Sequence, residues 1–250
     1  MYQSIPLKQI LFIDIETVPL YENYSEAPAR YKEFWEKKSN QFRGDESPET
    51  VYARAGIFAE FGKIVCISVG IVTGETQNPG FKLKSFAGDN EVDILSSFID
   101  LLLRLEKKHP VYLCAHNGKE FDYPYLSRRL LINALPLPET LNNGGKKPWE
   151  IKHLDTLELW KFGDYKHYTS LDLLTYVFNI DSPKAEIDGS QVARVFYIEK
   201  DIEKIKRYCE NDVIALMQIM MRYQGRPLIA PEFIQRSNIE VIEGNSAHPE

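Results

Sequence analysis

Cysteine, long apolar runs and excess positive charge are all scarce in this 250-residue sequence. Its three cysteines, Cys66, Cys114 and Cys209, have no zinc-like spacing, so we expect reduced thiols that pack as small buried hydrophobes. No apolar run is long enough to cross a bilayer, and the first residues lack the basic start and apolar core of a secretory signal. These absences predict a soluble, cytoplasmic protein.

The formal net charge of −6 argues against a protein that coats nucleic acid, because such binding needs many Lys and Arg contacts to phosphates. An enzyme that acts on one end of a strand remains compatible with it, since bound metal can neutralise an acidic centre. Also missing are an internal repeat, a phosphate-cradling glycine-rich loop, an HExxH zinc motif and a GxSxG serine elbow. The chemistry of the chain must therefore rest on other residues.

The length and the ordinary 44% hydrophobic content predict one large α/β domain with an insertion at about 21–56 and a C-terminal tail at 224–250. Apolar runs and alternation predict strands at 10–17, 63–72, 81–86, 111–115 and 151–156. Spacings of three and four predict helices at 29–38, 49–58, 90–107, 121–131, 157–162, 170–178 and 201–223. In the insertion helix, Tyr31, Phe34 and Trp35 are expected to pack down rather than to stack on bases.

Two carboxylates are set into the first apolar run, Ile10-Leu11-Phe12-Ile13-Asp14-Ile15-Glu16-Thr17. Side chains of a strand alternate between its faces, so Asp14 and Glu16 point the same way. Burying a carboxylate is costly unless a cation, a donor network or a metal offsets the loss of water. A hard divalent cation such as Mg²⁺ or Mn²⁺ is one suitable partner, although the pair taken alone favours the simpler interpretation that it caps the loop after the strand.

Further along the chain, two more carboxylates stand at informative places. Asp122 follows the polar His116-Asn117-Gly118 loop at the end of a short strand, and its position also suits the N-cap of the next helix. Tyr208 and Asp212 lie four residues apart on the last long helix, hence on consecutive turns of one face. An aspartate in an otherwise apolar stripe is not expected there for packing.

These motifs, Asp14-Ile15-Glu16-Thr17, Asn117 with Phe121-Asp122, and Tyr208-Cys209-Glu210-Asn211-Asp212, resemble the three exonuclease motifs of the DEDD superfamily in its tyrosine-containing (DEDDy) branch. The similarity is closest to the 3′–5′ exonuclease domain of family B DNA polymerases and to stand-alone bacterial exonucleases related to it. It covers the chain up to about residue 223, apart from the insertion. It implies a ribonuclease H-like fold: a mixed, mainly five-stranded sheet flanked by helices.

The resemblance also implies roles for single residues. Asp14, Glu16 and Asp212 would hold one of two divalent cations, Mg²⁺ or Mn²⁺, while Asp14 and Asp122 would act on the second. Tyr208 would hydrogen-bond the attacking water, orienting it rather than removing its proton, because a tyrosine with a pKa of about 10 is a weak base. The product would be a nucleoside 5′-monophosphate.

Contacts to nucleic acid are expected from Thr17, Asn117 and Phe121 and from the segment Lys161 to Tyr168. Basic and aromatic side chains that could grip or stack a single strand are Arg128, Arg129, Lys146, Lys147, Lys161, Tyr165, Lys166, His167 and Tyr168. A solvated surface explains these residues as well. Asp155, His116 and His153 are interpreted as structural.

The sequence thus predicts a metal-dependent 3′–5′ exonuclease that prefers single-stranded DNA. Two alternatives remain open: an exoribonuclease, because no motif reads the 2′-hydroxyl, and a binding module that keeps the fold without catalysis. No polymerase portion follows within these 250 residues, so we expect no proofreading in cis, and the sequence identifies no polymerase or repair partner.

Overall fold

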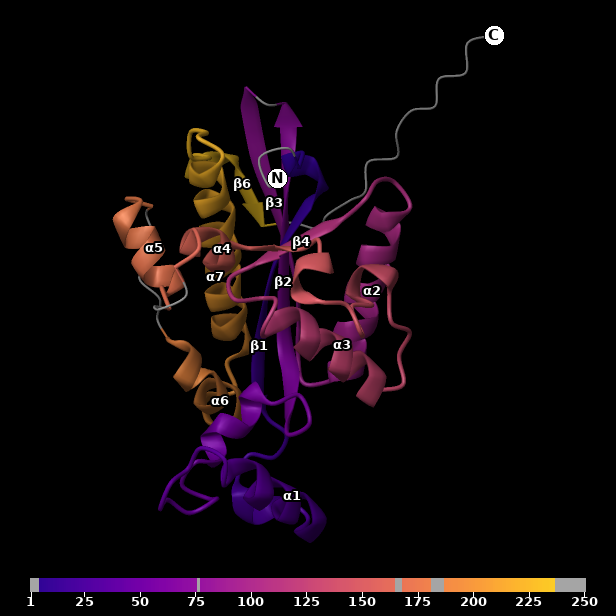
Figure 1. Ribbon diagram of the computed structural model, residues 1–250, viewed down its shortest axis with the longest axis vertical. Coiled ribbons are helices and arrows are strands. Elements are labelled where there is room, and N and C mark those ends of the chain that lie inside the picture. The colour runs from indigo at the N-terminus through magenta and orange to yellow at the C-terminus, as the bar shows by residue number, and fades with distance from the viewer. Residues whose placement is uncertain (1–4, 76, 165–167, 181–186, 237–250) are drawn as a thin grey trace.

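The computed structural model describes residues 5–75, 77–164, 168–180 and 187–236. Its centre is a six-stranded mixed sheet in the order β5-β4-β1-β2-β3-β6 (Figure 1). The strands are β1 Ile10–Pro19, β2 Gly62–Glu75, β3 Asn78–Ala87, β4 Tyr112–Ala115, β5 Leu154–Asp155 and β6 Ile234–Arg236. β1 pairs antiparallel with β2 and parallel with β4, and β3 is also antiparallel to β2, so β2 is the strand that runs against the other five.

Helices cover both faces of this sheet, with α2 and α3 on one side and α4, α5 and α7 on the other (Figure 1). The α-helices are α1 Ala29–Ser39, α2 Glu91–Glu106, α3 Asp122–Ile132, α4 Thr156–Lys161, α5 Leu171–Val177, α6 Val192–Arg194 and α7 Ile202–Tyr223. A π-helical turn spans Val195–Glu199, and short 3₁₀ turns span Leu7–Gln9, Tyr24–Glu26, Tyr52–Ile57, Glu139–Leu141, Pro148–Glu150, Gly189–Gln191 and Pro231–Phe233. Within the described ranges, none of the helices combines the length and the apolar character that a membrane span requires.

Side chains of β1 alternate between the two faces of the sheet, so this strand contributes to the hydrophobic core on both faces. Ile13 and Ile15 pack with residues of α2 and α3 in one core cluster. Ile10 and Phe12 pack with residues of α7 in another. Because side chains two apart share a face, Asp14 and Glu16 lie on the side that α7 covers.

Most of the expected elements form, and the differences are local. The sequence also suited Asp122 to the N-cap of its helix, but Phe121 occupies the N-cap and Asp122 is the first residue of α3, so its carboxylate is not used as a cap. The strand expected at 151–156 is limited to Leu154–Asp155, because β5 pairs with only two residues of β4. The helix expected at 49–58 is a 3₁₀ turn, Tyr52–Ile57.

The segment at 21–56, which the sequence suggested as an insertion, contributes most of an aromatic cluster centred on Trp35, which is fully buried. The Trp35 indole donates a hydrogen bond to the Pro48 carbonyl at 2.8 Å, and the Tyr31 hydroxyl donates to the Phe61 carbonyl at 2.8 Å. The expectation that Tyr31 and Trp35 pack down is therefore confirmed. It is wrong for Phe34, which is 48% exposed, with the Arg30 guanidinium over its ring.

The expected tail extends the sheet. β6 pairs in parallel with β3, which makes six strands where the resemblance implied mainly five. Before it, the Gln218 amide exchanges two hydrogen bonds with the backbone of Ile229, so this segment is held against α7. The rest of the expected tail, residues 237–250, lies outside the described residues.

Candidate active site

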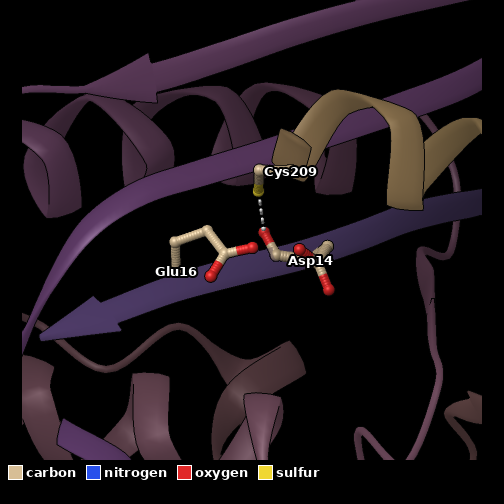
Figure 2. A group of neighbouring side chains, drawn as sticks. All are labelled: Asp14, Glu16 and Cys209. Carbon is tan, nitrogen blue, oxygen red and sulfur yellow. Dashed lines mark hydrogen bonds between the residues drawn. The ribbon is translucent and has the colours of Figure 1, made fainter. Parts of the chain in front are cut away.

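Asp14 and Glu16 project from β1 beside α7, where Figure 2 shows them next to Cys209. Each has a neighbour directly opposite on β2: Asp14 pairs with Ser68 and Glu16 with Cys66. The pairing register shifts between Glu16 and Thr17, a bulge of the kind that re-aims side chains near active sites. The Cys209 thiol donates a hydrogen bond to the Asp14 backbone carbonyl at 3.4 Å, which ties α7 to this part of β1.

Asp122 approaches the carboxylates of β1 from the side of β4, the strand that precedes it in the chain. The pairing of β1 with β4 ends at Phe12 and Cys114, so the backbone of β1 beyond this point has no strand on that side. The chain then turns through Asn117, whose φ of 62° is left-handed, and enters α3 at Asp122. A hydrogen bond with the Ile15 backbone holds the Asp122 carboxylate beside β1.

The last two members of the set come from α7. Tyr208 and Asp212 are one turn apart, and their side chains hydrogen-bond to each other. The charge of Asp212 also acts on Asp14, Glu16 and Asp122. The structure therefore brings together all five residues that the sequence singled out, from β1, α3 and α7.

Burial and mutual repulsion dominate the electrostatics of Asp14 and Glu16. Burial raises the pKa of the Asp14 carboxyl well above its usual value, and the charges of Asp212 and Asp122 raise it further. The pKa of Glu16 is raised well above its usual value by burial first and then by the charge of Asp14. Both carboxylates are thus destabilised in the charged form unless a cation joins them.

The other acidic groups behave in the same way. Burial raises the pKa of Asp122 to about 7, against the opposing effect of backbone hydrogen bonds. Burial likewise raises the pKa of Asp212 to about 7, although the hydrogen bond with Tyr208 lowers it. The pKa of Tyr208 is raised by burial and by the charge of Asp212, so its hydroxyl keeps the proton and donates to Asp212.

The residues present fit a hard divalent cation. One ligand atom each from Asp14, Glu16 and Cys209 lie within 4.8 Å of one another. The Asp14 Oδ2 oxygen is buried and has no hydrogen-bond partner, which is costly unless a cation completes its surroundings. Cys209 is the weaker ligand of this group, because burial raises the pKa of its thiol and hard cations prefer oxygen. The carboxylates are therefore the candidate metal ligands.

Asp155 lies near these carboxylates, but its oxygens are occupied by hydrogen bonds from the protein backbone. One of its oxygens accepts hydrogen bonds from the backbone N–H groups of Asn117, Leu157 and Glu158 at 3.0–3.2 Å, and the other accepts from Lys119 at 3.1 Å. These bonds cap α4 and hold the loop that leads to Asp122. The geometry supports the structural interpretation made from the sequence.

The two histidines are also engaged with protein atoms. The His116 ring contacts the Thr156 hydroxyl and the Thr169 carbonyl, both at 2.9 Å, and burial lowers its pKa. His153 accepts from the Leu113 N–H and contacts the Thr140 carbonyl, and burial lowers its pKa to about 4. Both rings are neutral near pH 7 and bridge loops to the sheet.

The expected nucleic-acid contacts divide into distinct groups. The side chain of Tyr168 is exposed over 65% of its surface. Its pKa is raised first by partial burial and then by the nearby charges of Asp155 and Asp122. Lys161 ends α4, and the backbone N–H of Asn117 is bound to Asp155. Tyr165, Lys166 and His167 lie outside the described residues.

Some of these candidates face the protein instead. Thr17 hydrogen-bonds with Tyr125, and Phe121 packs its ring against Tyr125 at a centroid distance of 5.4 Å. The prediction that Arg129 could contact nucleic acid is wrong, because its side chain is buried in an ion pair with Glu91 at 2.5 Å. The sequence alone does not separate these two roles, because the partner Glu91 lies 38 residues away along the chain.

Sequence reasoning missed three neighbours of the carboxylates. Cys66 and Cys209 were interpreted as small buried hydrophobes, and both are buried, but they also flank the carboxylates: Cys66 lies opposite Glu16 on β2, and the Cys209 thiol donates to the Asp14 carbonyl. Asp172, the second residue of α5, lies close enough to Asp212 to raise its pKa. The position of Cys209 directly after Tyr208 was the one signal that pointed toward the site.

A family model matches residues 57–229 of this chain, and its description is "Predicted 3'-5' exonuclease related to the exonuclease domain of PolB". The matched span contains Asp122, Tyr208 and Asp212 and begins after β1, the strand of Asp14 and Glu16.

Among solved structures, the chain is similar to the family B DNA polymerase from the hyperthermophilic archaeon Pyrobaculum calidifontis, with 16% identity and a TM-score of 0.51. The similarity covers 88% of this chain and 24% of that polymerase, so the chain spans about a quarter of its length. At this identity the likeness concerns the fold, and it confirms the predicted ribonuclease H-like architecture.

Proposed function

The chain belongs to a family of predicted 3′–5′ exonucleases related to the exonuclease domain of PolB, and we therefore propose that it is a metal-dependent 3′–5′ exonuclease acting on single-stranded DNA ends. The observation that carries this proposal is the convergence of Asp14, Glu16, Asp122 and Asp212, with the Asp14 Oδ2 oxygen buried and unpartnered. Four crowded carboxylates, one of which keeps a buried oxygen without a protein donor, favour a cation site over an inert core.

In this proposal the four carboxylates hold two divalent cations, Mg²⁺ or Mn²⁺. Bound at such a site, the ions would lower the pKa of a water and would stabilise the charge on the attacking and leaving oxygens at phosphorus. Asp14 and Glu16 supply ligands from β1, Asp212 from α7 and Asp122 from α3. The bulge after Glu16 and the bond from Cys209 hold the β1 carboxylates in place.

Hydrolysis adds a water oxygen to the terminal phosphorus and breaks the bond between that phosphorus and O3′ of the penultimate nucleotide. The product is a nucleoside 5′-monophosphate, and the shortened strand leaves with a free 3′-hydroxyl. Tyr208 orients the water rather than accepting its proton, because the raised pKa keeps its hydroxyl protonated. By the resemblance to the exonuclease family, Glu16 would approach the 3′-hydroxyl of the terminal nucleotide.

Tyr168 is the best-supported contact to the substrate. It is exposed, it lies beside Asp122, and its ring meets His116 edge-on at 6.1 Å. An exposed tyrosine at the margin of an acidic site gives an unpaired base a surface for stacking. Lys161, Lys166 and Asn117 remain proposed contacts to the backbone of the strand, whereas Thr17 and Phe121 contribute through the packing of this edge.

The proposal is tested by incubating the protein with Mn²⁺ and with end-labelled DNA and RNA strands of equal sequence. We expect a ladder that shortens from the 3′ end of DNA, and its loss in Asp14→Asn and Asp212→Asn. Asp100→Asn on α2, across the sheet from the carboxylates, is the matched control and should retain the ladder. A ladder on RNA alone would establish the exoribonuclease, and binding without cleavage would establish the inactive module.

A further inference from the structure

A line of buried polar side chains leads from the carboxylate site across the sheet. Cys66 and Ser68, opposite Glu16 and Asp14, approach each other at 3.7 Å through their side-chain Sγ and Oγ atoms. Ser68 is in turn opposite Ser85 on β3, and their hydroxyl oxygens are 2.9 Å apart. Polar groups thus run along the α7-facing side of three adjacent strands.

The line ends on a buried carboxylate of α7. Ser85 donates a hydrogen bond to Glu210 Oε1 at 2.8 Å, and Arg236 Nε of β6 donates to Glu210 Oε2 at 2.9 Å. A second Arg236 nitrogen donates to Asn211 Oδ1 at 3.3 Å. Only 4% of Glu210 is exposed, so this carboxylate depends on Ser85 and Arg236 to replace the water it has lost.

These contacts fix the position of α7 in the direction of its helix axis. Glu210 lies midway between Tyr208 and Asp212, and a helix is stiff over such a short distance. The Cys209 bond to Asp14 attaches this turn to β1, and the Glu210 bonds attach it to β3 and β6. A shift of about 1 Å at a catalytic group can reduce a rate by two orders of magnitude, so the second attachment matters for catalysis.

We propose that Glu210 and Arg236 are positioning residues, which fix Asp212 and Tyr208 against the β1 carboxylates through the strand β6. This inference rests on the proposed function. It makes the C-terminal strand part of the catalytic unit, although β6 lies beyond residue 229, where the family match ends.

The test compares Arg236→Met, Arg236→Lys and wild type by steady-state cleavage and by Mn²⁺-dependent melting. Arg236→Met leaves the Glu210 carboxylate buried without its cation, so the turn that bears Asp212 should shift. We expect kcat to fall about tenfold with KM unchanged, a higher Mn²⁺ concentration for half-maximal activity, and a smaller Mn²⁺-induced rise in Tm. Arg236→Lys should recover most of each loss. Arg30→Met is the matched control, because Arg30 forms an exposed ion pair with Glu33 on α1.

Ser85→Ala provides a second, smaller change in case Arg236→Met does not fold, and it should reduce kcat and the Mn²⁺ response in the same direction. Wild-type kcat and wild-type Mn²⁺ response in folded Arg236→Met, or in Ser85→Ala when the former is unfolded, would overturn the inference. The melting measurement needs no substrate. A wild-type protein that binds Mn²⁺ but cleaves no nucleic acid would therefore refute the proposed function. The Mn²⁺-dependent melting of the variants would still decide whether Arg236 positions the metal ligands.

Discussion

At the scale of single residues, replacing Tyr208 tests whether its hydroxyl orients the attacking water or the side chain only packs. Its raised pKa means that it donates a hydrogen bond to Asp212, so Tyr208→Phe removes that bond and leaves every carboxylate in place. We expect a single-turnover rate about 10²-fold below wild type, because the ions would still activate the water. The pH profile should also move upward, since the Tyr208 bond lowers the pKa of Asp212. Rates measured from pH 6 to pH 9 test both expectations.

Tyr176→Phe is the control for this change, because Tyr176 is 79% exposed on α5. It should match wild type. If Tyr208→Phe were equally fast, the hydroxyl would have no part in the reaction.

At the scale of elements, Asp155 connects β5, α4 and the loop that leads to Asp122. Asp155→Asn replaces one acceptor oxygen by an amide that faces backbone N–H groups, which should cost about 1–3 kcal/mol. The expected result is a Tm lower by several degrees with the Mn²⁺-induced rise in Tm retained, because Asp155 is not a ligand. Thermal melting with and without Mn²⁺ measures both quantities.

Asp188→Asn is a matched control, since Asp188 caps a short 3₁₀ turn at the surface and should leave the Tm near wild type. Loss of the Mn²⁺ response in a folded Asp155→Asn protein would instead make Asp155 a metal ligand.

At the scale of the whole molecule, we expect the crowded carboxylates to make stability depend on metal. A ligand that binds only the native state stabilises it by RT ln(1 + [L]/Kd), about 2.7 kcal/mol at 100 times Kd. For a chain of this size, Mn²⁺ should then raise the Tm by about 5 °C or more, and a chelator should reverse the change without unfolding. Asp14→Asn removes one repelling charge, so without metal it should melt at or above wild type, and it should gain much less from Mn²⁺.

The same carboxylates determine how this effect depends on pH. Their pKa values are raised in the folded protein, so between about pH 4 and pH 7 the native state binds more protons than the unfolded state. Without metal, stability should therefore fall as the pH rises through this range. The Mn²⁺-induced rise in Tm should be larger at pH 8 than at pH 6, where protons compete with the ion. A Tm that ignores millimolar Mn²⁺ at both pH values would favour the inactive binding module.

Local chemistry explains what could be predicted without coordinates. Periodicity located nearly all of the long elements, because the alternation of β1 and the apolar stripe of α7 follow directly from which residues must be buried. A carboxylate within a buried stretch conflicts with that pattern, and so Asp14, Glu16 and Asp212 could be singled out one at a time. Tyr208 could be linked to Asp212 because a helix places residues four apart on one face.

Tertiary structure alone decided how these pieces meet. The side chains of Asp122 and Asp14 come together because the pairing of β4 with β1 ends at Cys114 and leaves the backbone of Ile15 open to Asp122, which no local pattern encodes. The burial of Arg129 depends on Glu91 from another helix, and the sixth strand depends on the pairing of residues 234–236 with β3. A sequence determines which side chains need a partner, because that need is set by their own chemistry. Which partner meets it depends on contacts between residues far apart in the chain, and only the folded arrangement defines those.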